Sequence, residues 1–273
     1  MWVDLRTIDR YREGHVPNSC SIPLKELDPR LHELPPKGSH INLVFSEDMD
    51  AQALMQRFKG HSYTVNDFII DRGEGHSSFV EVGEVSKRLW TPAPYLSKHI
   101  KTIEEKLQEI YPGKQHEALD VACGCGREAV YLAERGWSVT GVDFQQILLD
   151  KANQLASQHK LSIKTILSDI EVPGADSVLP RGLSLIHVGR YLHRPLFPAM
   201  KEMIIPGGFV VYHTFMRGCE QFGRPKNPNF ILEEQELKRI FYNWTIIDYS
   251  EQFLDDGRPI QLIVAQKPFL NNS

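Results

Sequence analysis

The chain has 273 residues, of which 41% are hydrophobic and 24% are charged, and its formal net charge at neutral pH is −4. This composition is typical of an ordinary soluble globular protein with one large or two modest domains. The charge gives no overall basic signature, so a nucleic-acid partner is neither favoured nor excluded. No apolar stretch is long enough to span a bilayer, and the first residues do not have the pattern of a signal peptide, so no membrane contact is expected.

The four cysteines have no spacing that indicates a disulfide framework, which suits a reducing compartment. We therefore expect a cytoplasmic protein. Cys123 and Cys125 could form half of a metal site, but no matching pair of Cys or His residues is evident, so no metal ion is expected.

Residues 1–82 are predicted to form a separate small unit. Short extended segments at residues 3–6 and 21–24 precede a buried-strand pattern at Ile41–Phe45. Apolar residues at helical spacing follow over residues 51–58, and another strand begins at Tyr63. This alternation of strands and a helix predicts a small α/β sheet.

The first half of this unit resembles a rhodanese domain. The resemblance rests on residues that stand in the family's order, namely Asp4, Arg6, Tyr11, Gly14, His15 and Pro17. It implies a persulfide-forming cysteine after the strand Ile41–Phe45, but the chain has Ser46 there, followed by three carboxylates within four residues. A serine hydroxyl cannot carry transferable sulfur, and Cys20 falls in a different loop. The resemblance implies a small, N-terminally shortened rhodanese-like α/β domain, which we expect to be catalytically silent and to serve packing or binding of a protein partner.

Residues 83–95 are predicted to be a linker and lid segment, in which Trp90 precedes two prolines. A helical stripe of apolar residues then runs from Leu96 to Ile110 and ends at Pro112-Gly113. We expect Trp90 to close over a ligand pocket or, as an equal alternative, to plug the junction between the two domains.

The centre of the second domain is a strand, a glycine-rich turn, a helix and a second strand. The apolar run Leu119–Val121 stops at Gly124-Cys125-Gly126, a helical pattern follows over Arg127–Arg135, and a second strand ends in Asp143. Such a unit binds nucleosides, because the glycines let the backbone approach the ligand and the terminal carboxylate can accept from ribose hydroxyls. The glycine spacing alone also fits a nicotinamide enzyme.

Asp120, on the strand before the turn, separates these alternatives. With it the turn resembles the xDxGCGxG motif of class I S-adenosylmethionine-dependent methyltransferases, although Ala122 stands where that family usually has its first glycine. The resemblance implies S-adenosyl-L-methionine as cofactor and S-adenosyl-L-homocysteine as product. It assigns the cofactor contacts to Asp120, Ala122, Gly124, Gly126, Asp143, Phe144, Asp169, Ile170 and Trp90.

The methyl acceptor is expected beside the fourth strand, Leu183–Val188. The chain lacks the Asn/Asp-Pro-Pro-aromatic motif there, which argues against the branches that methylate adenine and glutamine. His187, Tyr191 and His193 are candidate catalytic residues, since a histidine with an ordinary pKa suits general-base work. The acceptor itself, whether a small molecule, an RNA or a protein, is not specified. Candidate acceptor-binding residues come from the fifth strand and the long loop that follows it, namely His213, Arg224, Lys226 and Asn227.

The chain ends in two strand patterns, at residues 245–253 and 261–267, joined by a turn that contains Gly257. A terminal hairpin is typical of class I methyltransferases. We therefore expect an α/β, Rossmann-like methyltransferase domain over residues 96–273, with a mostly parallel sheet that ends in an antiparallel hairpin. The alternative to an enzyme is a non-catalytic, cofactor-binding scaffold or regulatory protein.

Overall fold

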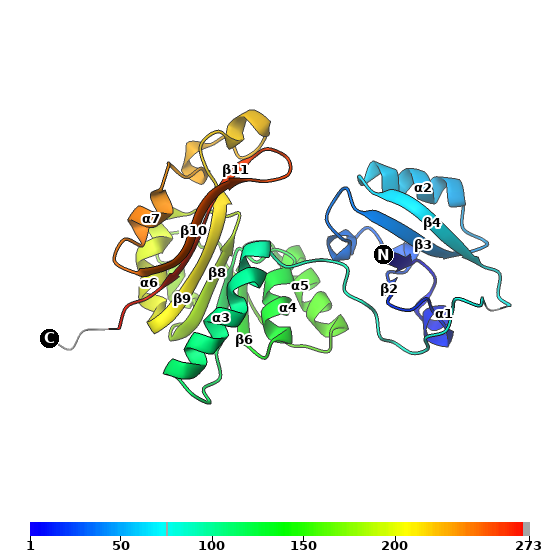
Figure 1. Ribbon diagram of the computed structural model, residues 1–273, viewed down its shortest axis with the longest axis horizontal. Helices are drawn as coiled ribbons and strands as arrows, with labels where there is room; N and C mark the ends of the chain where they lie inside the picture. Colours follow the sequence, from blue (N-terminus) through cyan, green and yellow to red (C-terminus); the bar gives the residue numbers. More distant parts are fainter. Residues whose placement is uncertain (75, 270–273) are drawn as a thin grey trace. The chain divides into compact units, whose positions relative to one another are not determined.

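The computed structural model describes residues 1–74 and 76–269. The chain divides into two compact units, the first comprising Met1–Thr91 and the second beginning at Pro92 (Figure 1). Each unit has its own sheet. The described helices include none that is both long enough and apolar enough to cross a membrane.

The first unit is built on a four-stranded parallel sheet in the order β2-β1-β3-β4. One helix predicted from sequence, α2, is present, and α1 is an additional short helix. The elements are β1 (Trp2–Asp4), α1 (Ile8–Glu13), β2 (Cys20–Ser21), β3 (His40–Ser46), α2 (Ala51–Gly60) and β4 (Thr64–Asp71). The structure therefore has the small α/β sheet that the strand and helix alternation predicts.

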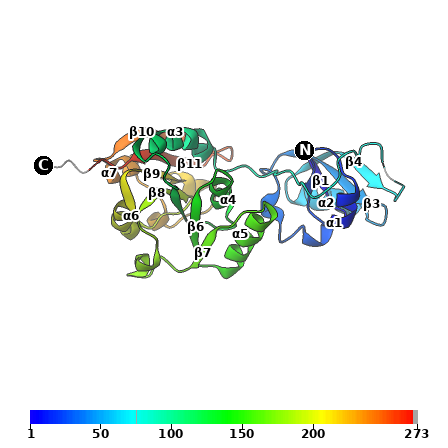
Figure 2. The same ribbon diagram turned by 90° about the horizontal axis from the view of Figure 1, so that it is seen from below.

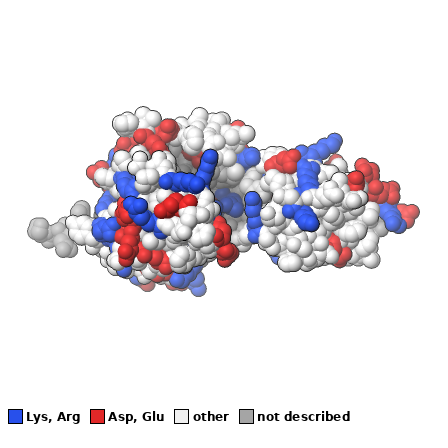
Figure 3. Space-filling view, turned by 90° about the horizontal axis from the view of Figure 1, so that it is seen from above, with Lys and Arg blue, Asp and Glu red and all other residues white. Residues whose placement is uncertain are grey.

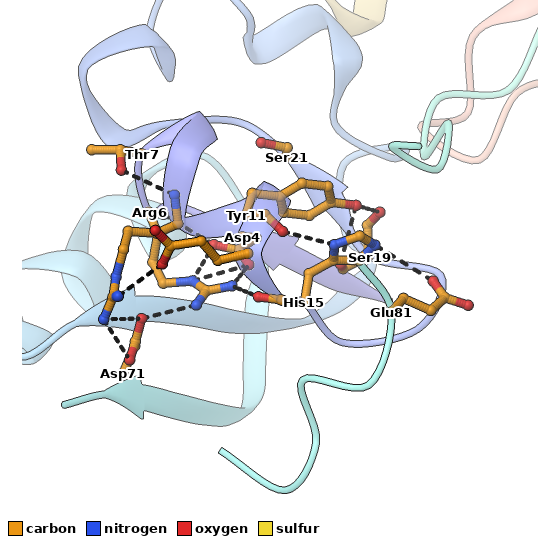
Figure 4. Close-up of polar contacts among 12 residues, drawn as sticks. Asp4, Arg6, Thr7, Tyr11, His15, Ser19, Ser21, Asp71 and Glu81 are labelled. Carbon is orange, nitrogen blue, oxygen red and sulfur yellow. Dashed lines mark hydrogen bonds and ion pairs between the residues drawn. The ribbon is translucent and has the colours of Figure 1, made fainter. Parts of the chain in front are cut away.

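A buried ion network ties the strand ends of this sheet together (Figure 4). The Arg6 guanidinium donates to Asp4 at the end of β1, to Asp71 at the end of β4, and to the carbonyl oxygen of Gly14. Arg6 and Asp4 are almost completely excluded from solvent. A buried guanidinium must be paired to be tolerated, and here every side of it has an acceptor.

Residues 79–87 run along the first unit as an ordered strap. The Phe79 ring lies 4.1 Å from the Arg6 guanidinium carbon, and the main chains of His15 and Glu81 bond to each other. The Tyr11 hydroxyl donates to the Val85 carbonyl oxygen over 3.0 Å. The first half of the segment predicted as a linker therefore belongs to the first unit by its contacts.

The second unit contains a seven-stranded sheet in the order β10-β11-β9-β8-β5-β6-β7 (Figures 1 and 2). Its elements are α3 (Pro94–Ile110), β5 (Glu117–Val121), α4 (Arg127–Glu134), β6 (Ser138–Asp143), α5 (Gln146–Gln158), β7 (Lys164–Leu167), β8 (Leu183–Gly189), α6 (Phe197–Met203), β9 (Ile204–Phe215), α7 (Glu236–Ile240), β10 (Thr245–Phe253) and β11 (Pro259–Gln266).

Strands β5 to β9 pair in parallel, whereas β11 pairs antiparallel with both β9 and β10. This confirms the predicted Rossmann-like sheet with a terminal hairpin. The strand order reverses at β5, which lies between β6 and β8. In open α/β sheets ligands bind outside the carboxyl ends of the strands at this switch point.

The two faces of the sheet differ in chemistry near the switch point. Leu119 of β5, Ile186 of β8 and Val210 of β9 point into one apolar core that also contains residues of α6 and α7. Because side chains alternate along a strand, Asp120 and His187 lie on the opposite face. Figures 1 and 2 show α3 and α6 on opposite sides of the sheet.

One predicted boundary differs from the structure. The sequence indicates a helix over residues 195–205 that is stopped by Pro206-Gly207-Gly208. The helix α6 instead ends at Met203, and these three residues lie within β9. Gly208 has no room for a side chain, since a Cβ there would lie 2.7 Å from the Ile204 side chain.

Candidate functional site

The glycine turn between β5 and α4 has a left-handed backbone at three positions. The φ angles are 53° at Ala122, 54° at Gly124 and 75° at Gly126. Gly126 packs so tightly that an added Cβ would lie 2.6 Å from the Ala152 Cβ in α5. The alanine at the family's first glycine position thus adopts a glycine-like conformation, which is uncommon for a residue with a side chain.

Asp143, at the end of β6, fixes this turn. Its Oδ2 accepts from the Gly124 N–H and its Oδ1 from the Gln145 N–H, each over 3.0 Å. A carboxylate offers about four acceptor positions, so lone pairs remain for further hydroxyl donors. The next side chain, Phe144, is exposed.

Asp169 and Ile170 follow β7, the strand next to β6. Asp169 is exposed and its Oδ1 accepts from the Glu171 N–H over 3.0 Å. Ile170 is buried in the apolar core rather than open to solvent. The acid and the neighbouring isoleucine therefore differ in how accessible they are to a ligand.

Asp120 and His187 meet at the switch point. They lie opposite each other in the register of β5 and β8, and His187 Nδ1 lies 2.7 Å from Asp120 Oδ1. Both side chains are buried. Burial raises the pKa of Asp120 in spite of His187. Burial also opposes charge on His187, but the hydrogen bond and charge of Asp120 outweigh it and raise the pKa of His187. A residue predicted to bind cofactor and one predicted to be catalytic thus form a single pair.

His213 of β9 lies beside this pair. The centres of the His187 and His213 rings are 5.7 Å apart, and Gly189 lies between their edges. A Cβ at Gly189 would come within 3.0 Å of His213 Cε1 and 3.2 Å of His187 Cε1. Burial, followed by the charges of His187 and Arg190, lowers the pKa of His213 to about 3. His213 is therefore neutral near neutral pH.

The other two catalytic candidates lie in the segment that follows β8. Tyr191 is half-buried, its carbonyl oxygen accepts from the Tyr212 hydroxyl over 2.8 Å, and burial raises its pKa. His193 is half-buried and precedes the short turn Arg194–Leu196. Of the three candidates, His187 alone is paired with a carboxylate on the neighbouring strand.

The acceptor-side loop between β9 and α7 carries Arg224, Lys226 and Asn227, all exposed. Arg258, in the hairpin turn, donates to the Arg224 carbonyl oxygen over 3.2 Å, and the Asn227 side chain accepts from the Asn229 N–H. The loop is thus held to the terminal hairpin.

Sequence reasoning missed a group of arginines around Arg190, which directly follows β8. The pKa of Arg190 is lowered by burial and by the charges of Arg127 and Arg258, which come from α4 and the hairpin turn. Glu128 and Asp256 oppose this effect. Three separate segments supply these cations, so no local pattern in the sequence could identify the group.

Trp90 belongs to the first unit. Its side chain is buried, and the Arg88 guanidinium lies 4.6 Å from the centre of its ring. Its role as a lid stays a prediction.

The described residues contain no cluster of three or more His, Cys, Asp or Glu side chains that could hold a metal ion. Cys123 and Cys125 lie in the glycine turn, where burial raises the pKa of both thiols. Figure 3 shows acidic and basic side chains interspersed over the second unit on the face in view.

The site fits S-adenosylmethionine better than a dinucleotide. The left-handed turn at Gly124 leaves the backbone open, since nothing lies within 4 Å of an added Cβ there. Asp143 keeps lone pairs that can accept from hydroxyl donors. The buried Asp120 carboxylate beside the turn is an acceptor that suits a cationic ammonium group and offers no donor to a pyrophosphate.

Comparison with known proteins assigns the chain to a protein family. The sequence pattern of the family described as tellurite resistance protein TehB matches residues 95–258. An uncharacterised protein of Schizosaccharomyces pombe is 22% identical over 97% of this chain and 93% of its own length. The probable S-adenosyl-L-methionine-dependent methyltransferase TehB of Haemophilus influenzae is 28% identical over 50% of this chain and 48% of its own length.

Solved structures similar to the chain include TehB from Haemophilus influenzae, with 23% identity, a TM-score of 0.48 and coverage of 63% of this chain and 66% of that one. The N-methyltransferase NodS from Bradyrhizobium japonicum in complex with S-adenosyl-L-homocysteine has 17% identity and a TM-score of 0.48, over 64% of this chain and 89% of that one. The chain spans about half the length of its Haemophilus relative. Because the family pattern covers more than half of the chain, the protein belongs to the tellurite resistance protein TehB family and is an S-adenosylmethionine-dependent methyltransferase.

Proposed function

We propose that the cofactor lies along the carboxyl ends of β5, β6 and β7, between the glycine turn and Asp169. Asp143 accepts from the ribose hydroxyls, Asp120 balances the cationic methionine end, and Asp169 with Ile170 and Phe144 flanks the adenine. The observation that carries this assignment is the position of Asp120 and Asp143 on either side of the glycine turn, at the switch point of the sheet.

The methyl acceptor is proposed to bind beside His187, with His213 and the segment Tyr191–His193 around it. The arginine group (Arg127, Arg190 and Arg258) supports an anionic acceptor, because an anion would relieve the mutual repulsion of these cations. The family takes its name from resistance to tellurite, itself an oxyanion. The exposed residues Arg224, Lys226 and Asn227 are proposed to contact a larger acceptor from the loop.

A labelled-methyl screen tests this function. Cell extract is divided into RNA, protein and metabolite fractions, and each is incubated with cofactor labelled in its methyl group and with wild-type protein or Asp143→Ala. We expect label to enter one fraction with wild type and to fall at least about tenfold with the variant, which corresponds to loss of a charge-assisted hydrogen bond. Retention of the labelled product on an anion exchanger supports an anionic acceptor, whereas equal labelling by both proteins contradicts the cofactor assignment.

The first unit is proposed to be a rhodanese-like domain without sulfurtransferase activity, present for packing or for binding a protein partner. Support comes from the parallel sheet, from the Asp4–Arg6–Asp71 network at its strand ends, and from Ser46 at the end of β3. Cys20 is buried, and burial raises the pKa of its thiol to about 12. Such a thiol is not a nucleophile at neutral pH.

A further inference from the structure

The Asp120–His187 pair has unsatisfied hydrogen-bonding capacity in a buried place. His187 Nε2 is enclosed and has no hydrogen-bond partner among the described residues, and Asp120 Oδ2 accepts from no described side chain. A buried polar atom without a partner costs about 1–3 kcal/mol. A pair of this kind at the ligand-binding edge of a sheet indicates that a ligand supplies the missing partners.

The protonation of the pair determines its net charge. When both imidazole nitrogens carry a proton, His187 is a cation that donates from Nδ1 to the Asp120 carboxylate, and the pair is neutral overall. After loss of the Nε2 proton His187 still donates from Nδ1 to Asp120, and the pair carries one negative charge. Only the second state balances the charge of a cation that arrives beside Asp120.

We propose that Asp120 and His187 act as a proton-releasing pair, which loses one proton to solvent when the α-ammonium group of the cofactor binds beside Asp120. This inference rests on the cofactor position proposed above. Loss of the proton leaves a free lone pair on His187 Nε2. His187 is then able to take the proton from a protic methyl acceptor, and Asp120 is its positioning residue.

Other groups around the pair shift the equilibrium between its proton-bound and proton-free states. Glu128 in the first turn of α4 raises the pKa of His187 and favours the proton-bound state. The backbone N–H of Ala129 lowers the pKa of Asp120, and Glu128 raises it. His213 faces His187 from β9 and is neutral across the range in which the pair titrates, because its pKa is about 3.

Calorimetric titration with S-adenosylhomocysteine, in two buffers of different ionisation enthalpy, measures the protons released on binding. With wild type we expect release approaching one proton per ligand at about pH 6, below the raised pKa of His187, and a smaller release as the pH rises above that pKa and the free pair loses its proton. His187→Gln should bind the ligand without proton release.

His99→Gln is the matched control. His99 and Asp248 form another histidine–aspartate pair, with Nε2 and Oδ2 separated by 2.8 Å, between α3 and β10. This variant should keep the wild-type proton release. A second measurement needs no variant: the ¹⁵N resonances of the His187 imidazole should change from the protonated to the neutral pattern when ligand is added at about pH 6.

The possible outcomes are distinct. Binding to wild type without proton release at any pH, or release that persists in His187→Gln, overturns the proton-releasing pair and leaves the proposed cofactor site intact. Failure of wild type to bind S-adenosylhomocysteine overturns the proposed cofactor site and the pair together. If His187→Gln does not fold, an unchanged imidazole spectrum in wild type still contradicts the inference.

Discussion

Asp143 joins the glycine turn to the start of α5 through one side chain. Replacing it with Ala removes the acceptors of the Gly124 and Gln145 N–H groups and the proposed ribose contacts. We expect S-adenosylhomocysteine affinity to fall about 10- to 100-fold in calorimetry, as expected for about 1.5–3 kcal/mol. Asp150→Ala, which removes an exposed acid of the same α5, should leave the affinity unchanged. Equal losses in both variants would contradict a specific role of Asp143.

His213 gives the stability of the protein a dependence on pH. Its folded pKa of about 3 lies below the value of about 6.5 for a histidine in an unfolded chain. The unfolded chain therefore binds more protons below about pH 6.5, so the contribution is complete above that pH and is lost as the pH falls towards 3. The stability lost between about pH 6.5 and pH 5 amounts to at most about 2 kcal/mol.

The His213→Gln variant isolates this contribution. In urea unfolding of the full chain, wild type should lose more stability between about pH 6.5 and pH 5 than the variant does, whatever the variant's absolute stability. The contribution of His187 is present in wild type and variant alike, so it cancels when the two slopes are compared. Identical slopes would show that His213 is not held neutral.

At the scale of elements, the turn that begins α4 depends on Gly126. Gly126→Ala would place a Cβ against Ala152 in α5 on a backbone with φ of 75°. Strain and overpacking together should destabilise the protein by about 2–4 kcal/mol in urea unfolding. Gly136→Ala is the control, because its φ is 87° but an added Cβ meets nothing within 4 Å. It should cost only about 1–2 kcal/mol, from the backbone alone. A control as costly as Gly126→Ala would rule out packing against α5 as the cause.

Elements with a strong local pattern were predictable, and those set by tertiary contacts were not. The stripe over residues 96–110 and the strand pattern of residues 138–143 match α3 and β6 because burial repeats with a regular period in each. Helix α1 has six residues and one buried side chain, Tyr11, which is too little for a periodic signal. Pro206-Gly207-Gly208 carries a stop signal for a helix, yet the pairing of β9 with β8 and β11 decides its conformation.

In the candidate site, too, the residues set by local sequence were predictable and those brought together by tertiary contacts were not. Asp120, Gly124 and Asp143 lie in one continuous βαβ unit, so the chain itself brings them together. The contact of Asp120 with His187 depends on the register of β5 and β8, which are not consecutive strands. The arginine group likewise requires α4, the end of β8 and the hairpin turn to converge, which only the sheet order determines.

At the scale of the whole molecule, the two units divide the chemistry between them. The residues proposed to hold the cofactor, apart from Trp90, lie in the second unit, whereas the first is a separate parallel sheet for which we propose a rhodanese-like role without sulfur transfer. Ser46 stands at the expected position of the nucleophile, and Cys20, the single cysteine of this unit, is buried beside Ser86 with a sulfur–oxygen distance of 3.7 Å. Sulfur transfer requires a thiolate that an external donor can reach.

We therefore expect the full chain to show no turnover of thiosulfate and cyanide above the rate without protein, and Cys20→Ser to be indistinguishable from wild type. The physical reason is that the Cys20 thiol, with a pKa of about 12, has almost no thiolate at neutral pH. Binding of labelled S-adenosylhomocysteine to the same samples shows that the second unit is folded. Turnover that disappears in Cys20→Ser would mean that the strap of residues 79–87 opens to expose this thiol, because Ser86, the hydrogen-bond partner of Cys20, lies within it.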